Sequence, residues 1–408
     1  MTAPQIDVLI IGGGPAGVAA ALALRQQGVA KVVLLEREAE LGGATRHCSH
    51  SPFGMREYRR IYLGHAYGRR LEAEARQAGV EVRTQHSVVR FEGEDGVLVS
   101  SPLGVETLYA RRIITATGAR EQPRAARLVS GDRPIGVLTT GALQAYVAFH
   151  GLMPFQQPLI VGSELVSMSA ILTCLSHGAR PVAVIEEGAG AIARVPMRWL
   201  PYVTRIPFHA QTRLVEILGQ GRVEAVMLQT GGTVRKLACD GVLFTGQFVP
   251  ETALLQNMDD GVPQGGAGAL IDQDGRLDNP RHFAAGNVLR GIETGGWAFR
   301  EGRAVGHAVA QDLLGPPVAI AGVQVRYAPP IKLVVPGLIR PGFLGQPAFS
   351  RFQLRVSRPV RGVISLQLDG LAVWQKQGQW LPERRILVPI PHQANHAKTI
   401  EFHCQEIQ

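Results

Sequence analysis

The sequence contains few cysteines, and none of them forms a recognisable motif. Its 408 residues include four, Cys48, Cys174, Cys239 and Cys404, with no C-x-x-C pair and no cysteine–histidine group at zinc-finger spacing. This scarcity argues against a disulfide-rich scaffold, a zinc finger and a cysteine-ligated cluster. We therefore expect no metal site, and no iron–sulfur cluster on this chain.

Lysine, aromatic residues and long apolar runs are also scarce. Lysine supplies 5 of the 42 basic residues, aromatic residues make up 6%, and the net charge is +9. The arginines are scattered, so we expect no nucleic-acid partner and attribute the charge to a solvated surface or an acidic partner subunit. No apolar run approaches the roughly 20 residues of a membrane span, and residues 1–6 lack a signal peptide's basic region. We expect a cytoplasmic protein without transmembrane segments, with peripheral contact to the inner face of the membrane left open.

Glycine, by contrast, is abundant, and its first cluster sits inside a specific pattern. The chain has 48 glycines. Residues 6–11 form a short β-branched run, G-x-G-x-x-G follows at 12–17, an Ala- and Leu-rich helix is expected over 18–27, and a second apolar strand over 32–36 ends in an acid. Strand, glycine turn, helix, strand and acid together are the dinucleotide-binding fingerprint.

Each part of this fingerprint has a physical task in binding an ADP group. Gly12 permits the tight turn, Gly14 lets the backbone approach a pyrophosphate, and Gly17 allows the helix to pack closely on the strand. The helix N-terminus offers free N–H groups to the phosphates. Glu36, 24 residues after Gly12, can accept hydrogen bonds from ribose hydroxyls. Pro15, Ala16 and Arg37 complete the residues we expect at this end of the cofactor.

Three further segments extend the pattern. Gly42-Gly43-Ala44-Thr45 follows Glu36 closely, residues 113–119 read as a strand that breaks into a glycine turn, and residues 283–287 read as another. A helix through Ala310 is expected after Thr294-Gly295-Gly296. In this order the segments resemble the two-dinucleotide-binding-domain flavoproteins, the superfamily of glutathione reductase, over roughly residues 5–315.

The resemblance implies FAD and places it. In that superfamily the first fingerprint holds the ADP half, the A-T-G segment closes over the cofactor, the late segment holds the ribityl chain, and the following helix points its N-terminus at the isoalloxazine. Asn287 stands where the superfamily has Asp, and its amide can still bond a ribityl hydroxyl. The cofactor residues implied beyond the fingerprint are Gly43, Ala44, Thr45, Val88, Ala116, Thr117, Gly118, Gly286, Asn287, Thr294 and Gly295.

Residues 158–186 repeat the opening pattern with one altered position. Gly162 and Glu186 are again 24 residues apart, which indicates an internal duplication and a second Rossmann-like domain. Glu164 replaces the middle glycine, so a charged side chain stands where pyrophosphate would approach. Ser167 is small enough to let the helix pack. We expect this domain to bind NAD(P) poorly or not at all, and a flavin to pass its electrons to oxygen, a quinone or a partner protein.

The segment after Gly42-Gly43 is rich in candidate catalytic groups. Arg46, His47, Cys48 and His50 lie there, and no second cysteine is near Cys48, which argues against disulfide-reductase chemistry. The segment resembles that of flavoprotein subunits of heteromeric hydroxyproline, opine and sarcosine dehydrogenases and of hydrogen cyanide synthase. His47 or His50 could act as acid or base, Arg46 could hold a substrate carboxylate, and Cys48 could lie against the flavin. Each of the four could instead orient the loop or meet a partner subunit.

The last ninety residues change in character. Short alternating segments at 323–327, 352–356, 363–368, 372–374, 386–389 and 399–404, with turns at Asp369-Gly370 and Gln377-Gly378, predict a small β-sandwich or barrel. The fold class expected is α/β, with two Rossmann-like three-layer ββα nucleotide-binding domains and a small C-terminal all-β domain. The expected units are a discontinuous FAD-binding domain over 1–120 and 265–315, a degenerate NAD(P)-type domain over 121–264, and the β domain over 320–408.

Three functions remain open from the sequence. The first is an FAD-dependent dehydrogenase subunit of a heteromer that oxidises an amine, imino acid or related small metabolite and passes electrons to a partner or quinone. The second is a structural or electron-relay subunit whose FAD touches no substrate. The third is an NAD(P)H-dependent flavin reductase, which requires the second site to tolerate Glu164.

Overall fold

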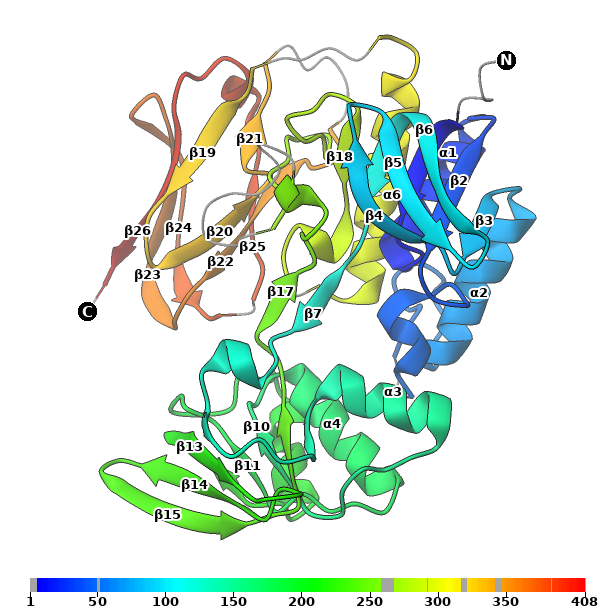
Figure 1. The fold of residues 1–408 in the computed structure, drawn as a ribbon. Coiled ribbons are helices and arrows are strands. Elements are labelled where there is room, and N and C mark those ends of the chain that lie inside the picture. Colours follow the sequence, from blue (N-terminus) through cyan, green and yellow to red (C-terminus); the bar gives the residue numbers. More distant parts are fainter. Residues whose placement is uncertain are drawn as a thin grey trace.

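The computed structural model describes residues 6–49, 52–257, 268–291, 293–316, 321–341, 347–382 and 384–407. Its first sheet has the order β3-β2-β1-β6-β5-β4, with β18 paired to β6 (Figure 1). The strands β1, β2, β3 and β18 run parallel to their neighbours, while β4 and β5 are antiparallel. The strand bounds are β1 Ile6–Ile11, β2 Val32–Glu36, β3 Glu81–Thr84, β4 Ser87–Glu92, β5 Gly96–Ser101, β6 Gly104–Thr115 and β18 His282–Ala284.

Three helices share an apolar core with this sheet: α1 (Pro15–Gln26), α2 (Gly64–Gln77) and α6 (Gly295–Asp312). The alanines of α1 leave little side chain on its surface, so α6 can approach its backbone closely. A Cβ placed on Gly302 would lie 1.9 Å from the Ala16 carbonyl oxygen. The glycine is therefore required by the helix contact, and this contact fixes the start of α1 against α6.

The second unit repeats the same topology. Its sheet has the order β12-β11-β10-β16-β9 with all strands parallel, the counterpart of β3-β2-β1-β6-β18. An antiparallel meander of β13, β14 and β15, with the short β8 at its edge, adjoins it at the bottom of Figure 1. The bounds are β8 Ser130–Gly131, β9 Val137–Thr139, α3 Thr140–His150, β10 Pro158–Val161, α4 Leu165–Ser176, β11 Ala183–Ile185, α5 Leu200–Val203, β12 Phe208–His209, β13 Thr212–Leu218, β14 Ala225–Thr230, β15 Thr233–Ala238 and β16 Gly241–Phe244.

Two antiparallel strands, β7 (Ala119–Glu121) and β17 (Phe248–Pro250), connect the two units. Beyond α6 the chain builds two further sheets, of order β21-β19-β26-β23-β24 and β20-β22-β25, beside the first unit (Figure 1). Their bounds are β19 Val323–Tyr327, β20 Ile331–Val335, β21 Leu338–Ile339, β22 Arg351–Val356, β23 Val360–Leu368, β24 Leu371–Trp380, β25 Ile386–Pro389 and β26 Ile400–Glu406.

One expected turn in this region is wrong. Asp369 and Gly370 do form the β23–β24 hairpin turn, with φ of 48° and 81°. Gln377 and Gly378, however, lie inside β24, where Gly378 pairs with Gly362. A Cβ on Gly378 would lie 2.9 Å from the Trp380 ring, so this glycine makes room for an aromatic side chain rather than for a turn.

The predicted fold class is confirmed: two Rossmann-like units and a strand-rich C-terminal region make an α/β protein. Within the described ranges, no helix is both long and apolar enough to cross a bilayer. The same residues contain no group of three or more His, Cys, Asp and Glu side chains placed to hold a metal ion.

Candidate functional site

The first glycine turn is shaped by backbone contacts on one side and open space on the other. Gly12 has a φ of +107°, and a Cβ on Gly17 would lie 1.9 Å from the Gly12 carbonyl oxygen. A Cβ on Gly14 would meet nothing nearer than the Gly43 Cα at 4.0 Å. Gly14 is the N-cap of α1 and Pro15 its first residue. The turn thus presents the helix N-terminus to an unfilled space, as a phosphate-binding turn requires.

Glu36 lies at the end of β2 with its carboxylate beside this turn. Its Oε2 accepts from the Gly13 N–H at 2.8 Å, and its Oε1 accepts from the Glu38 N–H at 3.0 Å. Each oxygen retains a lone pair for a further donor. Arg37 is exposed and pairs loosely with Glu38 at 3.6 Å. Val88 lies on β4, half-buried, beyond the link between β3 and β4.

The Gly42-Gly43 turn packs onto the first fingerprint. The Gly42 N–H donates to the Gly13 carbonyl at 2.8 Å, and Gly43, at φ +54°, brings its Cα near Gly14. Thr45 is buried and donates to the Gly42 carbonyl at 2.8 Å, while Ala44 stays exposed. These contacts place residues 43–45 at the mouth of the fingerprint.

The two later segments reach the same region through the sheet and through α6. The Ala116 carbonyl packs on Gly12, Thr117 Oγ1 donates to the Glu251 carbonyl at 2.7 Å, and Gly118 has a φ of +79°. On the other side a Cβ on Gly286 would lie 2.7 Å from the Ala16 Cβ. The chain therefore brings segments more than a hundred residues apart to one turn.

Asn287 carries the clearest sign of a missing partner. Its Nδ2 donates to the Glu293 carbonyl at 3.2 Å, which leaves Oδ1 facing away from that bond. Oδ1 is buried and has no hydrogen-bond partner among the residues that the structure describes. Thr294 is the exposed N-cap of α6 and its hydroxyl caps no backbone group, so Thr294 and Gly295 offer a second helix N-terminus. An unmatched acceptor, an open glycine cradle and two helix N-termini fit a flavin dinucleotide.

The candidate catalytic loop contains the 3-10 helix η1 (Gly43–His47), packed against α3. His47 lies edge-on to Phe149, with ring centroids 6.3 Å apart. The Arg46 guanidinium lies over the same ring and is held by Glu38 at 3.6 Å and by Glu40 at 3.7 Å. Two carboxylates of this chain therefore lie near Arg46, while its buried Nε has no hydrogen-bond partner among the described residues. His50, the fourth candidate, lies outside the described residues.

Cys48 is placed as a thiol rather than as a thiolate. Its Sγ donates to the Ala44 carbonyl at 3.3 Å and lies 3.7 Å from Gln144 Oε1. Burial, and then the charge of Glu121, raise the pKa of the Cys48 thiol to about 12. A neutral thiol is a weak nucleophile, so this environment disfavours nucleophilic chemistry at Cys48.

The structure also brings Glu121 to this loop, a residue that the sequence reasoning missed. Glu121 is buried on β7, where its Oε2 accepts from the Gly141 N–H at 2.7 Å and its Oε1 from the Gly246 N–H at 3.1 Å. A Cβ on Gly141 would lie 3.6 Å from Glu121 Oε2 and 3.9 Å from His47 Nε2. Burial raises the pKa of Glu121, and the hydrogen bonds from Gly141 and Gly246 offset only part of this rise. The available signal was an acid two residues after the A-T-G-A segment, in a strand that joins the two Rossmann-like units.

Glu164 closes the second glycine turn. It caps α4 in the place that Gly14 has in α1. Its Oε2 accepts from Ser167 and from Thr245, both at 3.2 Å, and its Oε1 would lie 2.2 Å from a Cβ on Gly246. Burial and the neighbouring Glu186 raise the pKa of Glu164 to about 7. The carboxyl group is folded into the turn, where its oxygens lie against Ser167, Thr245 and Gly246.

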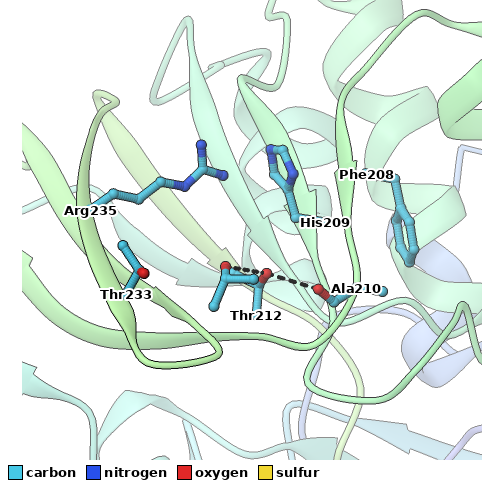
Figure 2. Close-up of a pocket in the computed structure, with 7 residues that line it drawn as sticks. Phe208, His209, Ala210, Thr212, Thr233 and Arg235 are labelled. Atoms are coloured by element: carbon cyan, nitrogen blue, oxygen red, sulfur yellow. Dashed lines mark hydrogen bonds between the residues drawn. The ribbon is translucent and has the colours of Figure 1, made fainter.

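A cavity of about 420 Å³ lies at the carboxyl edge of the same sheet, after β12. Figure 2 shows Arg235 reaching across it toward His209, above Thr212, which hydrogen-bonds the Ala210 carbonyl at 2.9 Å. Arg235 has no ion pair within the described part of the chain. The cavity is therefore basic and hydroxyl-lined, which suits an anionic ligand, although the adjoining fingerprint is closed.

Comparison with known proteins agrees with this arrangement. Residues 6–302 match the family described as "Pyridine nucleotide-disulphide oxidoreductase". The solved thioredoxin reductase of T. acidophilum superposes with a TM-score of 0.64 at 19% identity, over 76% of this chain and 99% of that one. L-proline dehydrogenase from P. horikoshii gives 0.60 at 19% identity, over 78% and 57%. These likenesses establish the fold.

Several curated relatives are named as subunits of oxidases. An opine oxidase subunit of Agrobacterium tumefaciens (strain Ach5) is 27% identical over 346 residues, 75% of this chain and 66% of the relative. The alpha subunit of sarcosine oxidase from Rhizobium meliloti (strain 1021) is 25% identical over 386 residues, 85% and 34%. The chain spans about half the length of the curated relatives that it matches. With a family match over most of its length, the chain belongs to the pyridine nucleotide-disulphide oxidoreductases, a family of flavin-dependent oxidoreductases.

Proposed function

We propose that this chain is the flavoprotein subunit of a heteromeric dehydrogenase that oxidises an amine, imino acid or related small metabolite. The contrast between the two glycine turns carries the proposal, since one is open at Gly14 and the other is filled by Glu164. An open flavin site beside a closed nicotinamide site favours a flavin that is reduced by a small substrate. Its electrons then go to a partner subunit or a quinone. The names of the opine and sarcosine oxidase relatives favour the same class of substrate and a partner subunit.

In this proposal residues 1–120 and 265–315 form the flavin-binding domain, 121–264 a degenerate nucleotide domain, and 320–408 a β domain. FAD, when bound, supplies the acceptor for a hydride from the substrate carbon. The backbone of residues 12–17 holds its pyrophosphate, Glu36 its ribose and Asn287 its ribityl chain, with Thr294 and Gly295 at the ring. His47 takes the substrate proton, and Glu121 holds the N-terminus of α3 beside it.

Two alternatives remain, each with its own support. A relay subunit without a substrate site is favoured by the position of Glu38 and Glu40 near the Arg46 guanidinium, because these carboxylates would compete with a substrate carboxylate. An NADPH-dependent flavin reductase is favoured by the basic cavity at Arg235 and His209. Glu164 argues against the second alternative.

The test is anaerobic reduction of the purified holoprotein, followed by its flavin absorbance. We expect NADH and NADPH to leave the flavin oxidised, and a panel of amines, imino acids and hydroxy acids to contain a compound that bleaches it. Fast bleaching by NADPH would establish the reductase instead. Bleaching by no compound, unless a second flavoprotein is added, would identify a relay subunit.

His47 has its own test within the same assay. The His47→Gln variant keeps a polar group of similar reach but cannot take up a proton at neutral pH. If His47 is the base, the variant retains flavin while the rate of substrate reduction falls at least about a hundredfold, the lower range for general base catalysis. Reduction at the parent rate would remove His47 from the chemistry.

A further inference from the structure

The helical side of the second unit exposes large apolar side chains. Helices α3 and α4 cover one face of its sheet, and the meander of β13, β14 and β15 covers the other (Figure 1). After β11 the chain runs beside α4 as the 3-10 helix η3 (Met197–Trp199) and the short helix α5 (Leu200–Val203). Four side chains of this segment are more than half exposed: Val195 at 56%, Trp199 at 53%, Tyr202 at 67% and Val203 at 76%.

The direction of these side chains follows from the way the segment packs. Met197 and Leu200 lie three residues apart and pack against the apolar core that includes α4, and Pro201 is buried. The opposite side of the two helical turns points away from that core. It carries Arg198, Trp199, Tyr202 and Val203. An outward helical face normally carries polar residues, so three large apolar side chains are exposed here where water contact is unfavourable.

Three arginines accompany these side chains without acidic partners. Arg194, Arg198 and Arg205 are exposed, and none of them forms an ion pair or a side-chain hydrogen bond in the described part of the chain. Residues 188–215 contain no Asp, Glu or Lys, and the helices α3 and α4 contain no acid either. We call the set of Val195, Trp199, Tyr202 and Val203 with these three arginines the 194–205 surface.

This combination of residues is typical of the centre of a protein–protein interface. Trp, Tyr and Arg are enriched at such centres, whereas Lys, Asp and Glu are depleted. The packed neighbouring helices also expose apolar side chains, Tyr146 and Phe149 on α3 and Leu165 and Leu172 on α4. The exposed apolar residues therefore extend along the helical layer and do not end at Trp199, as expected for a surface that a partner covers.

The charge of the 194–205 surface indicates which partner fits it. In a two-fold dimer the same surface lies on both sides, so a second copy of this chain would place arginines opposite arginines with no acid between them. A membrane surface fits poorly as well, because only residues 197–203 are helical here and amphipathic membrane helices are usually much longer. A protein whose carboxyl groups surround an apolar centre would neutralise the arginines and bury the aromatic rings.

We propose that the 194–205 surface binds the acidic partner subunit of the heteromer. Trp199 and Tyr202 form the centre of the contact, and Arg194, Arg198 and Arg205 pair with carboxylates of the partner around it. The inference rests on the proposed function, which supplies the partner subunit. It gives the second unit, whose glycine turn is occupied by Glu164, the task of holding that subunit.

The experiment starts from the complex assembled in the cells that naturally produce this chain. The complex is purified through a tag on the chain and separated by high salt, and the recovered partner subunit is the probe for binding. We expect Trp199→Ala to raise the dissociation constant about thirtyfold, as loss of a central anchor does. Arg198→Glu should slow association at low salt at least about tenfold, and high salt should reduce this effect.

The matched controls are Tyr109→Ala and Arg361→Glu, which change a similarly exposed tyrosine on β6 and an exposed arginine on β23. Both should bind the partner as the parent does. Thermal melting of each variant shows that it is folded. If Trp199→Ala does not fold, Arg198→Glu decides the matter, because its side chain is exposed.

The contrary outcomes separate this inference from the proposed function. Parent-like binding of the partner by Trp199→Ala and Arg198→Glu, or equal weakening in the two controls, would overturn the assignment of the 194–205 surface and leave the heteromer standing. Purification of the tagged chain without a second protein at a fixed ratio would refute the heteromer itself. Two further results would also overturn the inference. If the variants abolish self-association, the occupant is a second copy, and if they abolish sedimentation with anionic phospholipid vesicles, it is a membrane.

Discussion

Gly14 and Glu164 occupy the same position in two copies of one turn, 150 residues apart. A Cβ on Gly14 would have no neighbouring atom closer than 4.0 Å. Glu164, by contrast, folds its carboxyl group back toward Gly246 and Thr245. The rest of each turn is alike, because each second strand ends in an acid, Glu36 or Glu186, that pairs with the turn. A single side chain therefore separates an open glycine turn from one that is occupied by a carboxyl group.

Two glycines of the first turn should respond differently to the same substitution. Gly14→Ala adds a methyl group that meets only Gly43 at contact distance, so the apoprotein should melt as before. Its flavin affinity should fall about tenfold, or about 1.4 kcal/mol, because the methyl group faces the pyrophosphate. Gly17→Ala places its methyl group 1.9 Å from the Gly12 oxygen and should destabilise the fold by about 1–3 kcal/mol. Flavin titration and thermal melting separate the two effects, and equal flavin affinity in Gly14→Ala and the parent would contradict the assigned pyrophosphate position.

Glu164 should make the stability of the protein depend on pH. Its pKa is about 7 in the folded state, above the ordinary carboxyl value, so the folded state resists its ionisation. The full stability is present below the unfolded pKa near 4.5 and is lost as pH rises through 7. Glu164→Gln should therefore be more stable than the parent at pH 8 by roughly 1–2 kcal/mol, after allowance for solvent screening, and equal to it near pH 4.5.

The control for this experiment is Glu187→Gln, a change at an exposed neighbouring acid. Denaturant unfolding at both pH values gives the comparison. The charged groups that bear on Glu164 are Glu186, which raises its pKa, and Arg127, whose own pKa responds to Glu164 and Glu121. Equal stabilities of Glu164→Gln and the parent at pH 8 would show that the carboxylate is adequately solvated in the folded state.

At the residue scale, the sequence could predict what has a local pattern. The fingerprint positions Gly12, Gly14, Gly17 and Glu36 have fixed spacings, and the structure places them together. Glu121 could not be predicted, because its partners Gly141 and Gly246 are contributed by distant segments. The contacts of Glu293 with Arg355 and Arg385 could not be predicted for the same reason, since no spacing relates arginines near the C-terminus to an acid before α6.

At the scale of elements, the contact between α1 and α6 positions both helix N-termini of the proposed flavin site. Gly302 and Gly306 face the Ala16 and Ala20 backbone, where Cβ atoms would lie 1.9 and 2.6 Å from the carbonyl oxygens. Small residues on both helices thus bring the axes close. Because Pro15 and Gly295 are each the first residue of their helix, a change in helix spacing moves both ends of the cofactor site.

The substitution Gly302→Ala tests this contact. It should lower the free energy of unfolding by about 1–3 kcal/mol through overpacking, although alanine is the better helix former. Gly68→Ala in α2 is the matched control, because its Cβ would have only ordinary contacts, the nearest at 3.4 Å. We expect the control to be neutral or stabilised by up to about 1 kcal/mol. Denaturant unfolding gives both values, and a neutral Gly302→Ala would mean that the helices separate easily.

The accuracy of element prediction differs along the chain. The strands at 6–11, 32–36 and 158–161 fall where their apolar runs indicate, because parallel strands buried on both faces read as continuous runs. In the C-terminal region the expected turn at Gln377-Gly378 is wrong, since glycine there serves packing against Trp380. Strand β20 (Ile331–Val335), which pairs with β22, had not been predicted, although its run Ile-Lys-Leu-Val-Val is a local strand signal.

At the scale of the whole molecule, the C-terminal sheets share a core with the flavin unit. Leu333, Val335 and Phe349 belong to the same apolar cluster as the strands and helices around the first fingerprint. Gly337 and Leu338 donate backbone hydrogen bonds to the Ile271 carbonyl, each at 3.0 Å. A shared core predicts that the two parts unfold together, because neither can expose its side of the interface alone.

Arg340 is a buried polar link across this interface and provides the test. It is 5% exposed, its Nη1 pairs with Asp272 at 2.7 Å, and its Nη2 donates to the Leu277 carbonyl at 2.9 Å. Its backbone exchanges hydrogen bonds with the Gln273 side chain. Arg340→Gln leaves Asp272 buried without its cation and should lower the free energy of unfolding by about 3–5 kcal/mol.

Scanning calorimetry of the holoprotein measures both the loss and the cooperativity. We expect one transition in the parent and one, at lower temperature, in Arg340→Gln, because the apolar contacts of Leu333 and Phe349 still couple the parts. Arg326→Gln, an exposed change on β19, should melt like the parent. An early separate transition in which flavin stays bound would mean that the C-terminal sheets fold independently.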